Sequence, residues 1–167
     1  DSHLGYNAMG NVAHFQKNYD KAILDYTKAI ELKPDDADAY HYRANSYFGK
    51  MEYDRVIADI DKAIELNPDN AMYYSNRGSV YSTKGQYDRA IEDLDKAIAL
   101  DPKDYSAYYN RGNTYVKKGQ YDRSIADYTK AIELGYPSPD ATYYNRGLSY
   151  SNKGEYSRAI ADLDKAI

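Results

Sequence analysis

The stretch AYYNRGNTYVKKGQYDRSIADYTKAIEL, residues 107–134, has close copies on both sides of it in the sequence. The copies recur at an almost constant interval, since Pro34, Pro68 and Pro102 are each 34 residues apart and Pro137 follows after 35. A repeat of this length indicates stacked supersecondary units rather than a fold around one central core. The sequence therefore divides into five predicted repeats, at 3–36, 37–70, 71–104, 105–139 and 140–167.

Each repeat has the pattern of two helices. In the third repeat, Gly85 interrupts the helical pattern and Pro102 prevents the second helix from continuing. Asp36, Asn70 and Asp104 stand where a short acceptor side chain caps the first helix of a repeat. The sequence therefore predicts ten helices and no strands, at 3–16, 19–32, 37–50, 53–66, 71–84, 87–100, 105–118, 121–134, 140–153 and 156–167.

The residues at fixed places within each repeat resemble the tetratricopeptide repeat (TPR) family. Counted from the first residue of a repeat, the family pattern has an aromatic residue at position 4, a small one at 8, tyrosine at 11, glycine near 15, alanine at 20, a large apolar residue at 24, alanine at 27 and proline at 32. The third repeat has, in this order, Tyr74, Gly78, Tyr81, Gly85, Ala90, Leu94, Ala97 and Pro102. The resemblance covers essentially the whole chain. It implies an all-α fold, a right-handed superhelical solenoid of antiparallel helix pairs, as a single domain over 1–167.

The composition excludes several classes of protein. The charged fraction of 29% and the apolar fraction of 43% are those of a soluble folded protein. No apolar run is long enough to span a membrane, so membrane insertion is not expected. The net charge is -4 and basic residues alternate with acidic ones, which argues against nucleic-acid binding. Cysteine is absent, so disulfides and thiolate sites are excluded, but this does not decide the cellular compartment.

The tyrosines are predicted to belong to the core. Positions 4, 7, 8 and 11 of the first helix fall on one side of it at about 100° per residue. This places the tyrosines of positions 4 and 11 on the packed face, with a small residue at position 8 that lets the helices approach. The predicted core tyrosines are Tyr40, Tyr47, Tyr74, Tyr81, Tyr108, Tyr115, Tyr143 and Tyr150.

One departure from the family pattern suggests a ladder of ion pairs. Position 7, usually leucine in the family, is arginine in repeats two to five, and position 23 is aspartate in all five repeats. We expect each aspartate to pair with the arginine of the following repeat and to set the register between repeats. The alternative is that these charges are solvated on the helix shoulders. The expected pairs are Asp25 with Arg43, Asp59 with Arg77, Asp93 with Arg111, and Asp127 with Arg146.

The resemblance also implies a binding surface. In the family, the first helices of the repeats line an inner concave wall that binds peptides or partner proteins. Positions 2, 5, 6, 9, 12 and 13 map to a polar, nearly uncharged wall in this sequence. Asparagine, which recurs on this wall, carries both a hydrogen-bond donor and an acceptor, so a row of asparagines can hold the backbone of an extended peptide. The residues predicted to bind a peptide are Asn7, Asn11, His14, His41, Tyr42, Asn45, Ser75, Asn76, Ser79, Tyr109, Asn110, Asn113, Tyr144 and Asn145, together with Phe15, Phe48, Ser82 and Lys117 on the same wall. Simple solvation of the asparagines is the alternative.

The expected function is a non-catalytic scaffold that binds an extended peptide or a partner helix in this groove. Chaperone-binding members of the family hold a terminal carboxylate with lysine and arginine, but the matching positions here are His41, Asn45, Asn76, Ser106 and Asn110, so this ligand is not expected. No nucleophile, metal site or phosphate loop is apparent, so neither enzymatic activity nor a cofactor is predicted. Two histidines in the groove, His14 and His41, are read as ordinary hydrogen-bonding residues.

Two alternatives to the peptide scaffold remain. One is a self-assembly module that stacks through its terminal helix faces, and the other is the substrate-recognition arm of a larger enzyme. The last repeat stops part-way through its second helix, which leaves Ile160, Leu163 and Ile167 without a neighbour. We expect that the natural protein continues there, or that a second copy covers this face.

Overall fold

The computed structural model describes residues 2–167, which form ten α-helices, one short 3-10 helix and no strand. The helices are α1 (His3–Phe15), α2 (Tyr19–Leu32), α3 (Ala37–Gly49), α4 (Tyr53–Leu66), α5 (Ala71–Thr83), α6 (Tyr87–Leu100), α7 (Tyr105–Lys117), α8 (Tyr121–Glu133), α9 (Pro139–Asn152) and α10 (Tyr156–Leu163), followed by the 3-10 helix η1 (Asp164–Ala166). The expectation of ten helices is confirmed for this part of the chain. The tenth is shorter than predicted, because its last turn tightens into η1.

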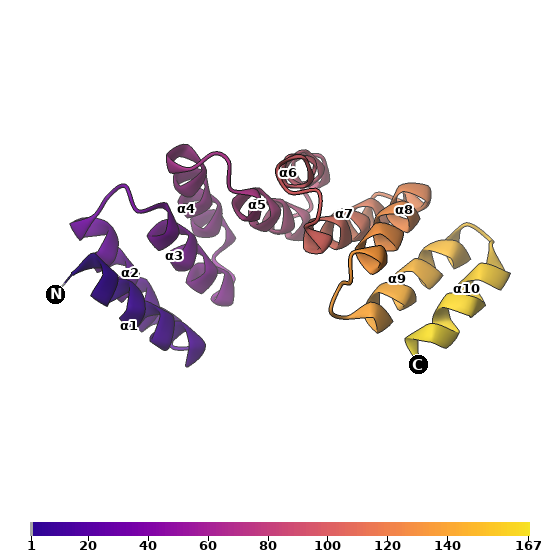
Figure 1. Cartoon of the computed structure of the whole chain (residues 1–167), viewed down its shortest axis with the longest axis horizontal. Coiled ribbons are helices and arrows are strands. Elements are labelled where there is room, and N and C mark those ends of the chain that lie inside the picture. Colours follow the sequence, from indigo (N-terminus) through magenta and orange to yellow (C-terminus); the bar gives the residue numbers. More distant parts are fainter. Residues whose placement is uncertain (1) are drawn as a thin grey trace. The chain divides into compact units, whose positions relative to one another are not determined.

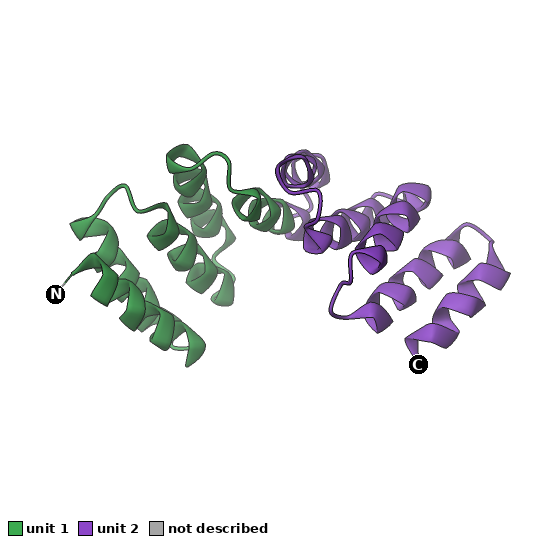
Figure 2. Ribbon diagram, viewed as in Figure 1, with its two compact units in different colours: residues 1–80 green, residues 81–167 purple. Residues whose placement is uncertain are grey.

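The helices pack as antiparallel pairs within two compact units, residues 1–80 and 81–167 (Figures 1 and 2). In the first unit α1 packs on α2, α2 on α3 and α3 on α4. In the second unit the same succession runs from α6 to α10. The division falls inside α5, whose residues up to Val80 belong to the first unit.

The helix ends follow the signals in the sequence. The predicted cap residues accept backbone N–H groups with their side-chain oxygens: Asp36 from Ala39 at 3.3 Å and Asp104 from Ala107 at 3.2 Å. Asn70 does the same for Met72 at 3.1 Å. These bonds satisfy amides that the first turn of a helix leaves without a partner.

The turn at position 15 has left-handed backbone geometry in all five repeats. Glycine, which adopts this geometry without strain, occupies it in Gly85, Gly119 and Gly154, with φ between 70° and 78°. The first two repeats have Lys17 and Met51 there, at φ 58° and 60°. The turn is therefore imposed by the packing of the helix pair even where the residue disfavours it.

Most of the predicted core tyrosines lie at the edge of the core rather than at its centre. Tyr40 and Tyr47 pack against the buried core, but among the tyrosines of positions 4 and 11 only Tyr115 is itself buried, and the core leaves the others partly exposed. Guanidinium groups cover them instead, with Arg43 5.6 Å from the ring centre of Tyr40 and Arg55 5.3 Å from that of Tyr47. Such distances allow cation–π attraction. The most deeply buried tyrosines are Tyr26, Tyr73 and Tyr128.

The ion-pair ladder also differs from the prediction. Each aspartate of position 23 that is seen with an arginine pairs with the arginine of its own repeat, and not with that of the next. Arg43 donates from Nε and Nη2 to the two carboxylate oxygens of Asp59, at 2.8 and 2.7 Å. The same two-fold contact joins Arg111 to Asp127 and Arg146 to Asp162. The expected pairing with the following repeat is therefore wrong, because the antiparallel partner helix of the same repeat lies closer.

The arginines do connect repeats, because their third nitrogen, Nη1, binds a residue at position 25 of the preceding repeat. Nη1 of Arg111 donates to Asp95 at 2.6 Å and Nη1 of Arg43 donates to Thr27 at 3.0 Å, both at position 25 of the preceding repeat. A second set of contacts between repeats joins a lysine at position 14 to an aspartate at position 18, as in Lys50 with Asp20 at 2.6 Å. A planar guanidinium with five donors can hold one carboxylate with two nitrogens while the third nitrogen binds the preceding repeat.

Candidate functional site

A buried histidine organises the predicted binding residues of the first unit. His41 on α3 is 3% exposed, and its Nε2 lies 2.8 Å from Nδ2 of Asn76 on α5 and 3.3 Å from Nδ2 of Asn45 on α3. Since amide nitrogens only donate, Nε2 accepts both bonds and the ring proton is on Nδ1. Burial lowers the pKa of His41, against the opposing effect of Asp38, so the ring is neutral at pH 7.

The predicted residues near the N-terminus are engaged within the protein. Asn7 is buried and donates from Nδ2 to Asp36 at 3.0 Å. Oδ1 of Asn11 accepts a hydrogen bond from the hydroxyl of Tyr26 at 2.8 Å, and Nδ1 of His14 lies 3.0 Å from the hydroxyl oxygen of Ser46. These three side chains therefore connect helices within the protein.

The second unit repeats this arrangement with a tyrosine in place of the histidine. Asn145 on α9 donates to the hydroxyl oxygen of Tyr109 on α7 at 3.0 Å and to Oδ1 of Asn113 at 3.5 Å. Asn113 also accepts the hydroxyl of Tyr128 at 2.7 Å. In both units, therefore, an asparagine at position 6 donates to the residue at position 5 of the preceding repeat.

The inserted residue of the fourth repeat adds a ring to this site. Tyr136 follows Gly135 in the turn after α8 and stacks on Tyr109, with ring centres 4.5 Å apart and an angle of 16° between the planes. Burial raises the pKa of Tyr136 above its ordinary value. The sequence shows only that the fourth repeat is one residue longer than the second and third, whereas in the structure the added residue stacks on Tyr109 and holds it in place. The only sign of this role in the sequence is that the extra residue occurs in one repeat alone.

The other predicted residues differ in how much surface they present. Ser75 is buried, while Ser79 and Asn110 are partly exposed. Tyr42 lies between Tyr26 and His41, with ring-centre distances of 5.9 and 5.6 Å. Tyr144 is half exposed. The amides and rings of this surface can form hydrogen bonds and apolar contacts.

A pocket in the first unit was not apparent from the sequence. It has a volume of about 190 Å³ and lies between α3, α4 and α5. Val56, Ile60 and Val80 form its apolar part, and Asn45 and Asn76 its polar part. The two amides are those that His41 orients, so the pocket and the histidine cluster form one site.

These features define a class of protein: an all-helical repeat array whose first helices carry oriented amides and aromatic rings. Family models described as "TPR repeat" match residues 10–50 and 78–119, and models described as "Tetratricopeptide repeat" match 37–70, 60–92, 105–134 and 141–167. The chain belongs to the tetratricopeptide repeat family. No curated protein sequence shows significant similarity to it.

Solved structures agree with this assignment. A crystal structure of MamA protein has a TM-score of 0.86 and 27% identity, covering 98% of this chain and 89% of that one. YrrB, described as a TPR protein with an unusual peptide-binding site, has a TM-score of 0.78 and 26% identity, with 97% and 83% covered. The pilF protein of Pseudomonas aeruginosa has a TM-score of 0.87 at 19% identity, with 99% and 76% covered, and supports the fold alone. Among residues 2–167, no helix is long and apolar enough to cross a membrane.

Proposed function

We propose that this protein is a non-catalytic scaffold that binds an extended peptide along the first helices of its repeats. The observation that carries the proposal is that the asparagines of these helices are held by neighbouring side chains. Nδ2 of Asn145 is fixed by Tyr109, and Nδ2 of Asn76 by His41. An amide that is already oriented loses less conformational entropy when it binds a peptide backbone. The family assignment and the peptide-binding site described for YrrB support the same function.

The composition of this surface suggests the chemistry of the partner. Tyr109, Asn110 and Tyr144 are uncharged and at least partly exposed. A surface of this kind recognises a peptide through its backbone and its apolar or aromatic side chains rather than through its charge. Binding should therefore weaken only slightly between low and physiological salt, since salt screens charged contacts most strongly.

A peptide-display selection followed by titration with single variants tests the proposal. Asn110→Ala and Tyr109→Ala should each weaken peptide binding by roughly tenfold, the effect of losing about 1.4 kcal/mol. Ala126→Ser, on the exposed side of α8, is a control that should bind as the unaltered protein does. Equal binding by all these proteins would count against a site on the first helices.

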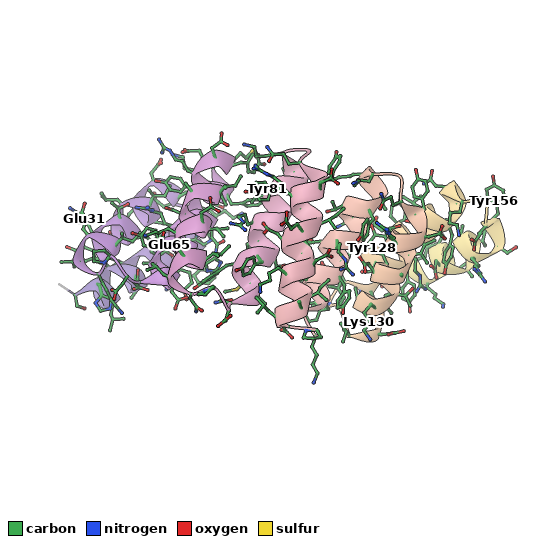
Figure 3. All side chains as sticks on the ribbon, turned by 90° about the horizontal axis from the view of Figure 1, so that it is seen from above. Glu31, Glu65, Tyr81, Tyr128, Lys130 and Tyr156 are labelled. Carbon is green, nitrogen blue, oxygen red and sulfur yellow. The ribbon has the colours of Figure 1, made fainter. Side chains whose placement is uncertain are left out.

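A second candidate function, self-assembly, is favoured by exposed apolar residues at both ends of the repeat array. Met9 and Val12 are exposed on α1, and Tyr156 and Ile160 on α10, where Figure 3 labels Tyr156. Apolar residues that gather on one helix face are characteristic of surfaces that bind a protein partner.

A further inference from the structure

Position 24 of the repeats distinguishes the pocket in the first unit from its equivalents. This position is Tyr26 in the first repeat and Tyr128 in the fourth, but Ile60 in the second, Leu94 in the third and Leu163 in the fifth. Both tyrosines are buried, and each donates its hydroxyl to the asparagine at position 9 of its own repeat, at 2.8 Å for Asn11 and 2.7 Å for Asn113. Two repeats thus fill the same place with a phenol ring and bind its hydroxyl in the same way.

The phenol ring requires a glycine beneath it. A Cβ atom added to Gly10 would lie 2.6 Å from Cε1 of Tyr26, and one added to Gly112 would lie 2.9 Å from Cε1 of Tyr128. The second repeat has Ala44 at this position, next to the shorter Ile60 in the buried core. The second repeat therefore has no aromatic ring at the place where the first and fourth repeats have one.

The pocket of about 190 Å³ lies where that ring is missing. It is lined by Ile60 itself and by Asn45, the counterpart of Asn11 and Asn113, with Phe48 and Val80 beside them. A cavity of roughly 150 Å³ lined by aliphatic and phenyl side chains holds a benzene molecule, so the volume suffices for a phenol ring. Both the position and the size of the pocket match the side chain of tyrosine.

The polar edge of the pocket suits a hydroxyl donor. Nδ2 of Asn45 is bound to His41, which makes Oδ1 the acceptor that Asn45 can present. The hydroxyls of Tyr26 and Tyr128 donate to this same oxygen of the asparagines in their own repeats. An aliphatic side chain would fill the pocket without making this bond.

We propose that the pocket between α3, α4 and α5 receives a tyrosine side chain of the bound peptide, with its hydroxyl donating to Oδ1 of Asn45. This inference rests on the proposed peptide-binding function and adds a side-chain preference to it. The partner would thus supply in the second repeat the phenol that the first and fourth repeats supply themselves.

The test uses p-cresol, the side chain of tyrosine, and toluene, which lacks the hydroxyl. Titration of the full chain with p-cresol should shift the methyl NMR signals of Val56 and Val80 in a saturable way. The affinity for p-cresol should exceed that for toluene by about fivefold, because one neutral hydrogen bond contributes a factor of this order. The absence of saturable shifts with p-cresol would overturn the proposal.

A double variant that places a tyrosine in the pocket gives the decisive comparison. Ala44→Gly with Ile60→Tyr recreates the glycine and tyrosine of the first and fourth repeats, and should weaken p-cresol binding more than about tenfold by occupying the site. Ala58→Tyr, which adds a tyrosine on the exposed side of α4, should leave binding unchanged. Equal p-cresol binding by the double variant and the unaltered protein would contradict the proposal. Circular dichroism checks that the helices are retained.

A milder variant covers the case in which the double variant does not fold. Asn45→Ala removes the acceptor and should bring the p-cresol and toluene affinities within about twofold of each other. A preference for p-cresol that persists in this variant would refute the assigned hydrogen bond. If p-cresol does not bind but selected peptides still respond to Asn110→Ala, this inference fails while the proposed function stands.

Discussion

The pairing of one arginine with one aspartate shows how single residues determine the packing of a repeat. Asp59 is buried and receives two hydrogen bonds from Arg43. In the first repeat the equivalent aspartate, Asp25, is also buried, but position 7 is Met9. Its Oδ2 has no hydrogen-bond partner among residues 2–167. A buried carboxylate is costly unless it is paired, so the two repeats differ in local stability.

Removal of the arginine should therefore be more harmful than removal of the pair. Arg43→Met should lower the free energy of unfolding by about 3–5 kcal/mol, because it leaves the carboxylate of Asp59 buried and alone. The double variant Arg43→Met with Asp59→Leu should recover a large part of this loss, as measured by urea unfolding. A double variant as unstable as the single one would show that the arginine acts through packing and not through its charge.

Conversely, the first repeat should gain from an arginine. Met9→Arg offers Asp25 the two-fold contact seen between Arg43 and Asp59, and should raise the midpoint of thermal unfolding. Met9→Lys is the matched control, since it brings the same charge without the planar pair of donors. A larger increase with lysine than with arginine would contradict this explanation.

His41 should make the first unit sensitive to acid. Burial lowers its pKa in the folded protein below the ordinary value of 6.5, so the unfolded chain takes up the proton first as the pH falls. The stabilisation is then complete above about pH 6.5 and is lost as the pH decreases towards the folded pKa. Protonation would also place an N–H group against Nδ2 of Asn76.

The control variant for this effect is His41→Gln, which keeps an acceptor but does not titrate in this range. Between pH 7 and pH 5, thermal unfolding of the unaltered protein should shift to lower temperature by more than that of the variant. The carboxylates titrate in both proteins, so the difference isolates the histidine. Parallel curves would show that His41 does not carry the pH dependence.

At the level of helices and turns, the regular parts could be predicted and the side-chain pairings could not. Proline, glycine and cap residues stand at fixed intervals, so the bounds of α1 to α9 agree with the predicted ranges within a residue or two. The partner of Arg43 depends on how close two antiparallel helices lie. The spacing of residues along one helix gives no information about that distance. The pocket beside Ile60 depends on the absence of a ring, and only the comparison of position 24 between repeats reveals it.

The turn at position 15 provides a prediction at this scale. Met51 has φ 60° and a mostly exposed side chain, so its replacement removes backbone strain and loses few contacts. Met51→Gly should stabilise the protein by about 0.5–1 kcal/mol, since the strain relieved slightly exceeds the entropy that glycine loses on folding. The reverse change, Gly85→Ala, should destabilise it, because φ there is 75°. Urea unfolding measures both, and a destabilised Met51→Gly would contradict the argument.

At the scale of the whole molecule, the first and last repeats lack the charged residues that form ion pairs between neighbouring repeats. Between repeats, lysine at position 14 meets aspartate at position 18, as in Lys153 with Asp122 at 2.5 Å. The first repeat has Gln16 at position 14 and the last has Ser157 at position 18. A contact between α1 of one copy and α10 of another would therefore bury apolar side chains without leaving this lysine or this aspartate unpaired.

Such a contact predicts head-to-tail association that two variants can separate. Val12→Asp and Ile160→Asp each place a charge on one of the two faces and should reduce concentration-dependent light scattering, since burying an apolar side chain contributes about 1.5–3 kcal/mol. Asn110→Ala should scatter as the unaltered protein does. Because Val12→Asp keeps the α10 face and Ile160→Asp keeps the α1 face, an equal mixture should form dimers although each variant alone stays monomeric. A contact of α10 with α10 would instead let the variant altered on α1 dimerise on its own, because its α10 face is unchanged.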